Sequence, residues 1–199
     1  AKSYITQLTI LIALAYQISE NQELFNLLEQ LPDIIKDSFQ LENQVQNVIP
    51  FFRNSEHLLI FGRGLLYGLV QESELKIQET SYLDARCYSA SDYQHGPIAT
   101  SLSFVPTIFF IADKQTDKSI IQLHQRLKEE KNIFSLIISN KDNISELGDL
   151  SIKIPHQYDG LSAVFVCAII SQMFACLLSI ARGYNPDSPI GVSKHTVTI

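Results

Sequence analysis

The sequence predicts an α/β fold, a doubly wound parallel sheet sandwiched between helices. Three observations predict it: short runs that are apolar throughout, amphipathic stretches between them, and an apolar share of 46 % over 199 residues. Strands without polar alternation are typical of a parallel sheet that helices cover on both faces. The length and the apolar share are enough for a buried core, and ligands of such folds bind beyond the carboxyl ends of the strands.

The N-terminal fifty or so residues are predicted to be helical. Residues 1–19 follow a helical pattern from the first residue and lack an initial Met, so we expect them to belong to a longer chain. Residues 21–52 also have helical periodicity, which Pro32 breaks or restarts and Pro50 stops. Two helices or one kinked helix fit this second stretch.

The rest of the chain alternates strands with helices. Four apolar runs are predicted strands, at residues 57–61, 105–112, 133–139 and 150–155. Helices are predicted over residues 65–82, 116–131 and 161–181. No internal repeat or flexible linker interrupts residues 33–199.

The charge and the cysteine content exclude several classes of partner. The net charge is −6 and the 15 Lys and Arg residues are scattered, so the sequence indicates neither nucleic-acid binding nor binding to an anionic membrane surface. The three cysteines form no CxxC pair and no even disulfide framework. We therefore expect a cytoplasmic protein.

Two uncharged stretches, residues 5–19 and 161–181, raise the question of a membrane. The second is long enough to cross a bilayer, but polar residues such as Ser171 and Gln172 interrupt it and anchoring residues are missing at its ends. We expect a helix buried in a core or in a dimer interface. Because both stretches are too uncharged for a solvated surface, we predict a homodimer built partly on these two helices.

Gly62 and Gly64 form a turn between a predicted strand and the following helix. Backbone N–H groups at such a turn can bind an anion. The spacing is GxGxxxG rather than the dinucleotide fingerprint, and the turn contains no Ser or Thr hydroxyl. We interpret it as a tight strand-to-helix turn and not as a nucleotide site.

Glu72, Lys76 and Glu79 are spaced so that all three share one face of the predicted helix. A charged stripe of this kind is usually a solvated face. It leads, however, into residues 81–97, which we expect to be a long functional loop, and His95 lies there before a Gly-Pro turn. Two interpretations stay open from the residues alone: a solvated helix with its exit loop, or the acid and base groups of an active site.

Three separate segments resemble the SIS (sugar isomerase) domain family of the glucosamine-6-phosphate synthase type. The segment "ESELKIQETSYLDARCYSASDYQHGPIA", residues 72–99, is similar to the family pattern E-x-x-L-K-x-x-E followed by a small-residue loop and H-G-P. The ending "NPDSPIGVSKHTVTI" resembles that of the family, and "AKSYITQLTILIALA" resembles the helix that closes the first of two tandem SIS domains. The resemblance implies a flavodoxin-like SIS fold, with residues 1–32 closing a missing first domain and residues 33–199 forming the second.

The resemblance also implies an enzyme that acts at C1 and C2 of phosphosugars. Glu79 matches the carboxylate that moves a proton between these carbons, with Glu72 and Lys76 as supporting charges. His95 matches a ring-opening histidine that reaches into the site of the neighbouring subunit. Lys194 matches a tail lysine that contacts the open-chain carbonyl and can form an imine. No metal and no organic cofactor is implied.

Departures from the family pattern limit what the chain can do alone. The Ser/Thr-rich turn that holds the substrate phosphate in the family does not occur in this sequence, so we expect the phosphate pocket, like any amidotransferase domain, to lie outside the chain. Ile190 stands where synthases usually carry Arg, which favours a deaminase or deglycase over a synthase.

Two functions from different classes remain. The first is the isomerase half of a synthase-like protein, acting as an isomerase, deaminase or deglycase on a hexose 6-phosphate or an amino-sugar phosphate. The alternative is a non-catalytic SIS module that binds a sugar phosphate in a regulator. A regulator has no need of the charged helix, the H-G-P segment and the tail lysine together, so their joint presence favours the enzyme.

Overall fold

A computed structural model of the chain describes residues 2–100 and 105–191. Within these residues, five parallel strands form a sheet in the order β2-β1-β3-β4-β5. The strands are β1 His57–Gly62, β2 Asp84–Ser89, β3 Pro106–Ile111, β4 Phe134–Ser139 and β5 Leu150–Lys153. The strand order reverses between β1 and β3, which is the mark of a doubly wound sheet. The predicted fold class is confirmed.

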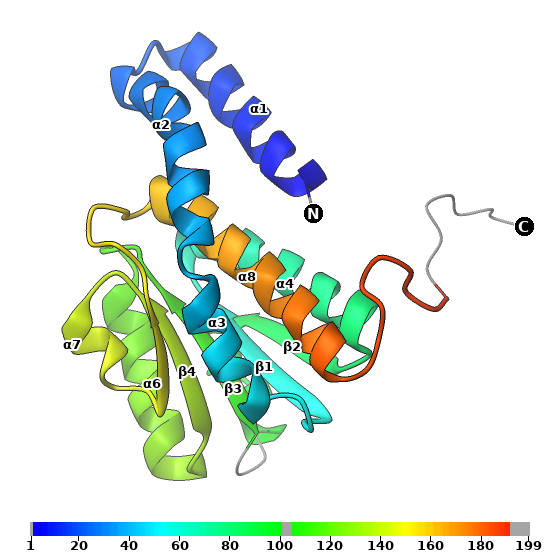
Figure 1. The fold of residues 1–199 in the computed structure, drawn as a ribbon. Helices are drawn as coiled ribbons and strands as arrows, with labels where there is room; N and C mark the ends of the chain where they lie inside the picture. Colours follow the sequence, from blue (N-terminus) through cyan, green and yellow to red (C-terminus); the bar gives the residue numbers. More distant parts are fainter. Residues whose placement is uncertain (1, 101–104, 192–199) are drawn as a thin grey trace, which may run out of the picture.

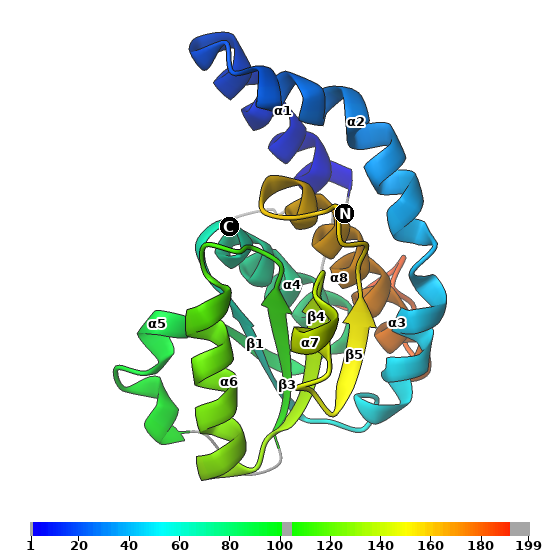
Figure 2. The ribbon, with the colours of Figure 1, turned by 90° about the vertical axis from the view of Figure 1, so that its left-hand side faces the viewer.

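Helices cover both faces of this sheet (Figures 1 and 2). One face carries α3 Glu42–Val48, α4 Tyr67–Ser81, α8 Leu161–Ala181 and the lower end of α2 Gln22–Phe39. The other carries α5 Ala90–Tyr93, α6 Asp117–Lys131 and α7 Asp142–Ser145. Short 3-10 turns at Ile49–Phe51, Gly64–Leu66 and Pro97–Thr100 link these elements. The remaining helix, α1 Lys2–Ser19, packs against α2 and extends beyond the sheet with it.

The alternating side chains of the strands divide the interior into two cores. Ile108 and Phe110 of β3 belong to the larger core, which α4 and α8 complete. Phe109 and Ile111 point to the other face and belong to a smaller core with residues of α5 and α6. The two faces of the sheet are therefore buried under different helices, as the uniformly apolar strands predict.

The prediction of a long loop over residues 81–97 is wrong. The structure has the edge strand β2 there, then α5 and a turn. Asp84 and Arg86 of β2 are exposed, whereas Ala85 between them is buried. An edge strand is only half buried, so it needs no apolar run. Its polar composition therefore concealed it.

The helix α2 is continuous through Pro32. Pro32 is exposed, so the carbonyl group that lacks an N–H partner in the preceding turn can be solvated. The helical stretch instead divides at residues 40–41, between α2 and α3. The domain boundary suggested at residue 32 thus lies inside one helix.

The apolar helix α8 is a core helix. It is long and apolar enough to span a membrane, the one such helix in the described residues, and 72 % of its most apolar window is buried inside the protein. Burial against α4, α2 and α3, and in one core with residues of the sheet, accounts for its composition. The helix α1 differs, because Leu11 and Leu14 on its outer side are 61 % and 53 % exposed.

Candidate active site

A cavity of about 290 Å³ lies between α4, α8 and the segment that follows α8. Two of the predicted site residues, Lys76 and Glu79, line it together with Thr80. The other walls come from α8 and from the returning segment, residues Gln172, Ala175, Cys176, Pro186, Asp187 and Pro189. Figure 1 shows α4 and α8 side by side and the segment after α8 turning back beside the end of α4.

The helix α4 presents charges to this cavity because its opposite face is fixed in the core. Leu69, Val70, Ser73 and Ile77 of α4 are buried, and this face packs against α8 and the sheet. The helix ends at Ser81, and the capping residue Tyr82 adopts the left-handed conformation with φ 52° and donates its backbone N–H to the Gln78 carbonyl. The charged face therefore cannot rotate into the core without unpacking α4.

Lys76 lies between two carboxylates on the exposed side of α4. Its Nζ atom is 2.6 Å from Oε2 of Glu79 and 4.0 Å from Oε1 of Glu72. The side chains of Glu72, Lys76 and Glu79 are 18 %, 22 % and 29 % exposed. Pairs of this kind on a helix contribute only about 0.3–1 kcal/mol, so a bound ligand can take over the partners of Lys76 at little cost. The predicted grouping of the three residues is confirmed.

The arrangement suits proton transfer better than nucleophilic attack. A carboxylate that reaches a cavity can accept a proton from a carbon beside a carbonyl group. The thiol of Cys176 is a weak nucleophile, because burial, and then the charges of Asp187 and Glu42, raise its pKa. Cys87 donates a hydrogen bond to Glu74 Oε2 at 2.9 Å, and burial together with Glu74 raises its pKa to about 12.

Tyrosine contacts hold the returning segment at the end of α4. The rings of Tyr82 and Tyr184 meet edge to face with their centroids 4.6 Å apart. The hydroxyl of Tyr82 also accepts the backbone N–H of Ile190. These contacts bring Asp187 to the cavity, which sequence periodicity could not predict because the contact is between distant segments. The quoted C-terminal motif contained Asp187, but gave it no role.

His95 lies apart from this cavity. It is exposed, in the turn after α5. The helix α5 is anchored by Tyr93 in the smaller core, on the opposite side of the sheet from α4. Within one chain, the structure therefore does not bring His95 and Glu79 together. Lys194 lies outside the described residues, three positions beyond Gly191.

The glycine turn after β1 is a packing feature. A Cβ atom at Gly62 would come within 2.8 Å of the Leu66 carbonyl oxygen and of Val70, and Gly64 has φ +60°. Both glycines are therefore required by the close approach and the conformation of the turn. The interpretation as a tight strand-to-helix turn agrees with this geometry.

A second cavity, of about 460 Å³, lies beyond the carboxyl ends of the strands and beside the start of α8. Its charged lining residues are Glu23, Asp113, Lys114 and Asp159. Three carboxylates against one ammonium group disfavour a phosphate there. This cavity does not replace the missing phosphate pocket.

Comparison with known proteins identifies the family. Residues 51–182 match the SIS domain family. The whole chain is 28 % identical over 200 residues to the glutamine–fructose-6-phosphate aminotransferase (isomerizing) of Aquifex aeolicus, and 29 % identical over 202 residues to that of Legionella pneumophila. It spans 33 % of the length of each of these relatives.

Solved structures share the fold. The C-terminal domain of glucosamine-fructose-6-phosphate aminotransferase from Francisella tularensis matches with a TM-score of 0.69 and 22 % identity, over 82 % of this chain and 45 % of that one. The glucosamine-6-phosphate deaminase of Thermotoga maritima matches with a TM-score of 0.64 and 20 % identity, over 93 % of this chain and 53 % of that one. From the sequence match over more than half of its length and from this fold, the chain belongs to the SIS domain family.

Proposed function

We propose that the chain is the isomerase half of an enzyme that moves a proton between C1 and C2 of a hexose 6-phosphate or an amino-sugar phosphate. The observation that carries the proposal is the Lys76–Glu79 pair at a cavity closed by the C-terminal segment. The names of the aminotransferase relatives support the substrate class. The name of the deaminase of like fold is in keeping with it.

In the proposed reaction, Glu79 acts as the base. Its carboxylate takes a proton from the carbon beside the sugar carbonyl, the electron pair of that C–H bond forms the C1–C2 double bond, and the carbonyl oxygen or imine nitrogen takes up a proton from solvent, which gives an enediol or enediolamine. The same group, now an acid, returns the proton to the neighbouring carbon while the other hydroxyl loses its proton to solvent and becomes the new carbonyl, so the two steps balance. Lys76 pairs with this carboxylate, Glu72 supports Lys76 from its other side, and Lys194 contacts the open-chain carbonyl.

We propose that the second subunit supplies the ring-opening group. The position of His95, on the face of the sheet away from Glu79, supports an action in a neighbouring site rather than in its own. An imidazole can pass a proton between the ring oxygen and the anomeric hydroxyl near neutral pH. A homodimer is therefore part of the proposal.

The rest of the protein is proposed from the relatives, which are about three times as long as this chain. Residues 1–32 would close a preceding SIS domain that carries the phosphate pocket, and residues 33–199 would form the second domain. We place the protein in the cytoplasm, where sugar phosphates occur. The alternative, a non-catalytic sugar-phosphate-binding module of a regulator, predicts binding without proton exchange.

Substitution of Glu79 by Gln tests the proposal. In the full-length protein, we expect Glu79→Gln to slow the exchange of the C1 or C2 proton with solvent by about 100-fold or more, because the amide keeps the shape and loses the base. Proton NMR in deuterium oxide with fructose 6-phosphate and glucosamine 6-phosphate measures this exchange. Binding of both sugars should change little.

The matched control is Glu130→Gln, which removes the carboxylate of an exposed ion pair on α6, 2.8 Å from Arg126. It should leave exchange unchanged. If Glu79→Gln keeps more than about a tenth of the wild-type rate, less than the loss expected for a general base, Glu79 is structural. Binding of sugar phosphate by the wild type without any exchange would favour the regulator module.

A further inference from the structure

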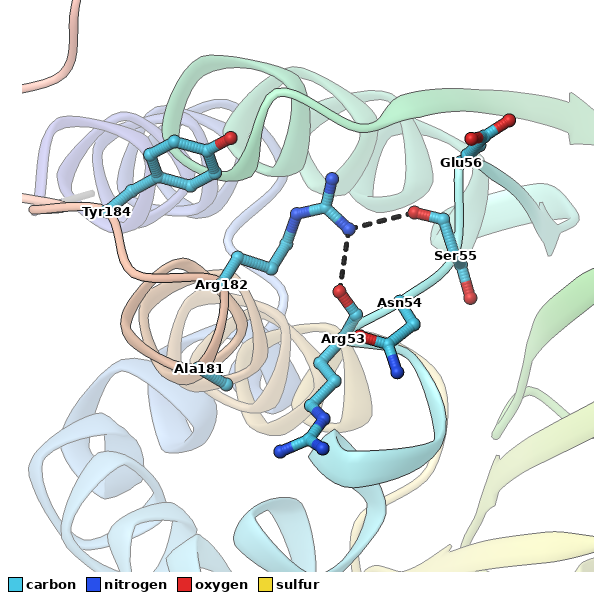
Figure 3. A pocket seen from close by; sticks show the side chains of 7 residues that line it. All are labelled: Arg53, Asn54, Ser55, Glu56, Ala181, Arg182 and Tyr184. Atoms are coloured by element: carbon cyan, nitrogen blue, oxygen red, sulfur yellow. Dashed lines mark hydrogen bonds between the residues drawn. The ribbon is translucent and has the colours of Figure 1, made fainter.

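The guanidinium group of Arg182 lies where three parts of the chain meet. Its Nε atom donates to the Ser81 carbonyl at 2.9 Å. Its Nη1 atom donates to the carbonyls of Arg53 and Ser55, both at 2.8 Å (Figure 3). Arg182 directly follows α8, so it ties the end of this helix to the end of α4 and to the segment that leads into β1.

These contacts do not form an anion site, although Arg182 and Arg53 both line a cavity of about 440 Å³. The side chain of Arg53 points away from Arg182 (Figure 3). Two donor atoms of Arg182 are already bonded to backbone carbonyls, and Glu56 adds a negative charge to the lining. The role of Arg182 is therefore to hold the chain together at this point.

One of the segments that Arg182 holds is the end of α4. Ser81 follows the proposed base Glu79 by two residues. Between them, the Thr80 carbonyl accepts a hydrogen bond from the Ser179 hydroxyl at 2.7 Å. The last turn of α4, and with it Glu79, is thus fixed to the last turn of α8.

The segment that returns over the cavity begins directly after Arg182 and is held by other groups. The backbone N–H of Tyr184 donates to the Ser179 carbonyl at 3.0 Å, and its ring packs on Tyr82. Ile190 is held by the Tyr82 hydroxyl. Arg182 is therefore the point from which the chain leaves α8 and begins to cross toward Glu79.

We propose that Arg182, with Tyr82, is a positioning residue that sets the C-terminal segment against Glu79. The inference rests on the proposed function, since the contacts of Arg182 and Tyr82 would hold residues 183–191 against Glu79, the proposed base. An arginine suits the task because its planar group donates in several fixed directions, which a lysine ammonium does not. Small displacements of reacting groups cost large factors in rate.

The test compares Arg182→Ala and Arg182→Lys with the control Arg53→Ala in the full-length protein. Arg53 is on the same cavity, and only its backbone carbonyl, which the substitution keeps, contacts Arg182. The first readout is sugar proton exchange with fructose 6-phosphate, as kcat and KM. The second is the rate at which N-ethylmaleimide labels Cys176, resolved by peptide mass spectrometry.

The labelling rate of Cys176 shows whether the segment after α8 is held in place, and it does not depend on catalysis. It lines the cavity with Asp187, and burial and that charge both raise the pKa of its thiol. The cysteine is already partly exposed, and release of the segment moves Asp187 away from it and uncovers it further, so more thiolate forms and labelling speeds up. A wild type without proton exchange would overturn the proposed function, whereas the labelling rates would still decide the role of Arg182.

For Arg182→Ala we expect kcat to fall about tenfold or more, KM to stay within about twofold, and Cys176 to be labelled about fivefold faster. Arg182→Lys should be intermediate, and added guanidinium should restore part of the kcat of Arg182→Ala. Arg53→Ala should match the wild type. The inference would be overturned if Cys176 in the folded Arg182→Ala variant were labelled at the wild-type rate. It would also be overturned if guanidinium restored none of the lost kcat.

Tyr82→Phe keeps the inference falsifiable if Arg182→Ala does not fold. It removes only the hydroxyl that accepts the Ile190 N–H and keeps the ring contact with Tyr184. We expect Cys176 labelling to be about threefold faster with an unchanged melting temperature, because one hydrogen bond holding the segment is lost. Labelling of Cys176 at the wild-type rate in Tyr82→Phe would contradict the proposed role of Tyr82 and Arg182 in positioning the segment.

Discussion

His124 is a buried histidine on the inner side of α6, only 2 % exposed, with its ring edge against Phe109. Its Nε2 atom is 3.1 Å from the Ser135 hydroxyl, whose proton goes to Asp149. In the part of the chain that the structure describes, Nδ1 has no hydrogen-bond partner. A proton on Nδ1 would be buried without an acceptor, so the ring is held neutral.

Acid should therefore destabilise the fold through His124. Burial, and then the charge of Lys128, lower its pKa to about 4, against the opposing effect of Asp149. Above the pKa of about 6.5 in the unfolded chain, both states are neutral; below it, the unfolded chain takes up the proton first. Stability is then lost as the pH falls from 6.5 toward 4, by about 2 kcal/mol at pH 5. Urea unfolding at pH 7.5 and pH 5 measures this loss.

His124→Asn is the control for that prediction, because an amide can still donate to Ser135 but does not titrate. The variant should be less stable at pH 7.5, yet lose about 2 kcal/mol less than the wild type between the two pH values. Carboxylates titrate in both proteins and cancel in the comparison. Equal losses in the two proteins would show that His124 protonates freely in the folded state.

Among the site residues, those that the sequence could predict are the ones related by local geometry. Glu72, Lys76 and Glu79 are three and four residues apart on one helix, and helical periodicity alone groups them. Asp187 reaches the same cavity only because the chain after α8 turns back onto Tyr82. No local pattern contains that contact, since it depends on where α8 ends relative to α4.

At the scale of the elements, α8 shows how composition alone leaves two environments open. A helix that is apolar on all sides fits a membrane or a crowded core equally well. The structure packs it against α4, α2 and α3 and in one core with residues of the sheet. Its polar residues have partners there, such as the Ser171 hydroxyl, which donates to Ser73 of α4 at 2.7 Å.

Phe174 of α8 should therefore matter for folding. It is 3 % exposed and meets Phe52 edge to face, with the ring centroids 5.2 Å apart. Phe174→Ala should lower the free energy of unfolding by about 3–5 kcal/mol, because it leaves a cavity between α8 and the sheet. Urea unfolding followed by circular dichroism measures it.

Ile180→Ala on the same helix is the matched control. Ile180 is 57 % exposed, so its truncation should change the free energy of unfolding by no more than about 0.5 kcal/mol. If both variants unfold like the wild type, α8 does not lie in the core of the folded chain.

The elements missed or misplaced from the sequence are those that tertiary structure decides. The apolar runs identified β1, β3, β4 and β5; the three inner strands β1, β3 and β4 need no alternation because helices cover both of their faces. The edge strand β2 reads as a polar segment, since only Ala85 and Ser89 in it are fully buried. Pro32 suggested a break that does not occur, because its exposed position in α2 tolerates the lost hydrogen bond.

At the scale of the whole molecule, the α1–α2 pair extends beyond the sheet (Figures 1 and 2). The helix α1 is joined to α2 by contacts such as that of Tyr16 with Phe25, at 5.3 Å between ring centroids. Its outer side carries an apolar stripe of exposed residues, Ile10, Leu11, Leu14 and Ile18. Their spacing puts all four on one face of the helix.

Such a stripe is unfavourable in water. Under the proposed domain division, a preceding domain would cover it in the full protein. In the 199-residue chain alone no such domain is present, so a second copy is the apolar surface available to it. The sequence predicted a dimer built partly on two helices. Because α8 is largely buried in its own chain, we now predict that only α1 contributes to this dimer.

We therefore expect the 199-residue chain to form a dimer through the stripe on α1, and Leu14→Glu to weaken it. Leu14 is 53 % exposed in the single chain, so the charge should leave the melting temperature nearly unchanged. In the dimer the same carboxylate would be buried without a partner, which should raise the dissociation constant about tenfold or more. Sedimentation velocity over a concentration series measures the dissociation constant.

Gln125→Glu on the exposed side of α6 makes the same charge change and should behave as the wild type. A wild-type chain that sediments as a monomer throughout the series would contradict the dimer.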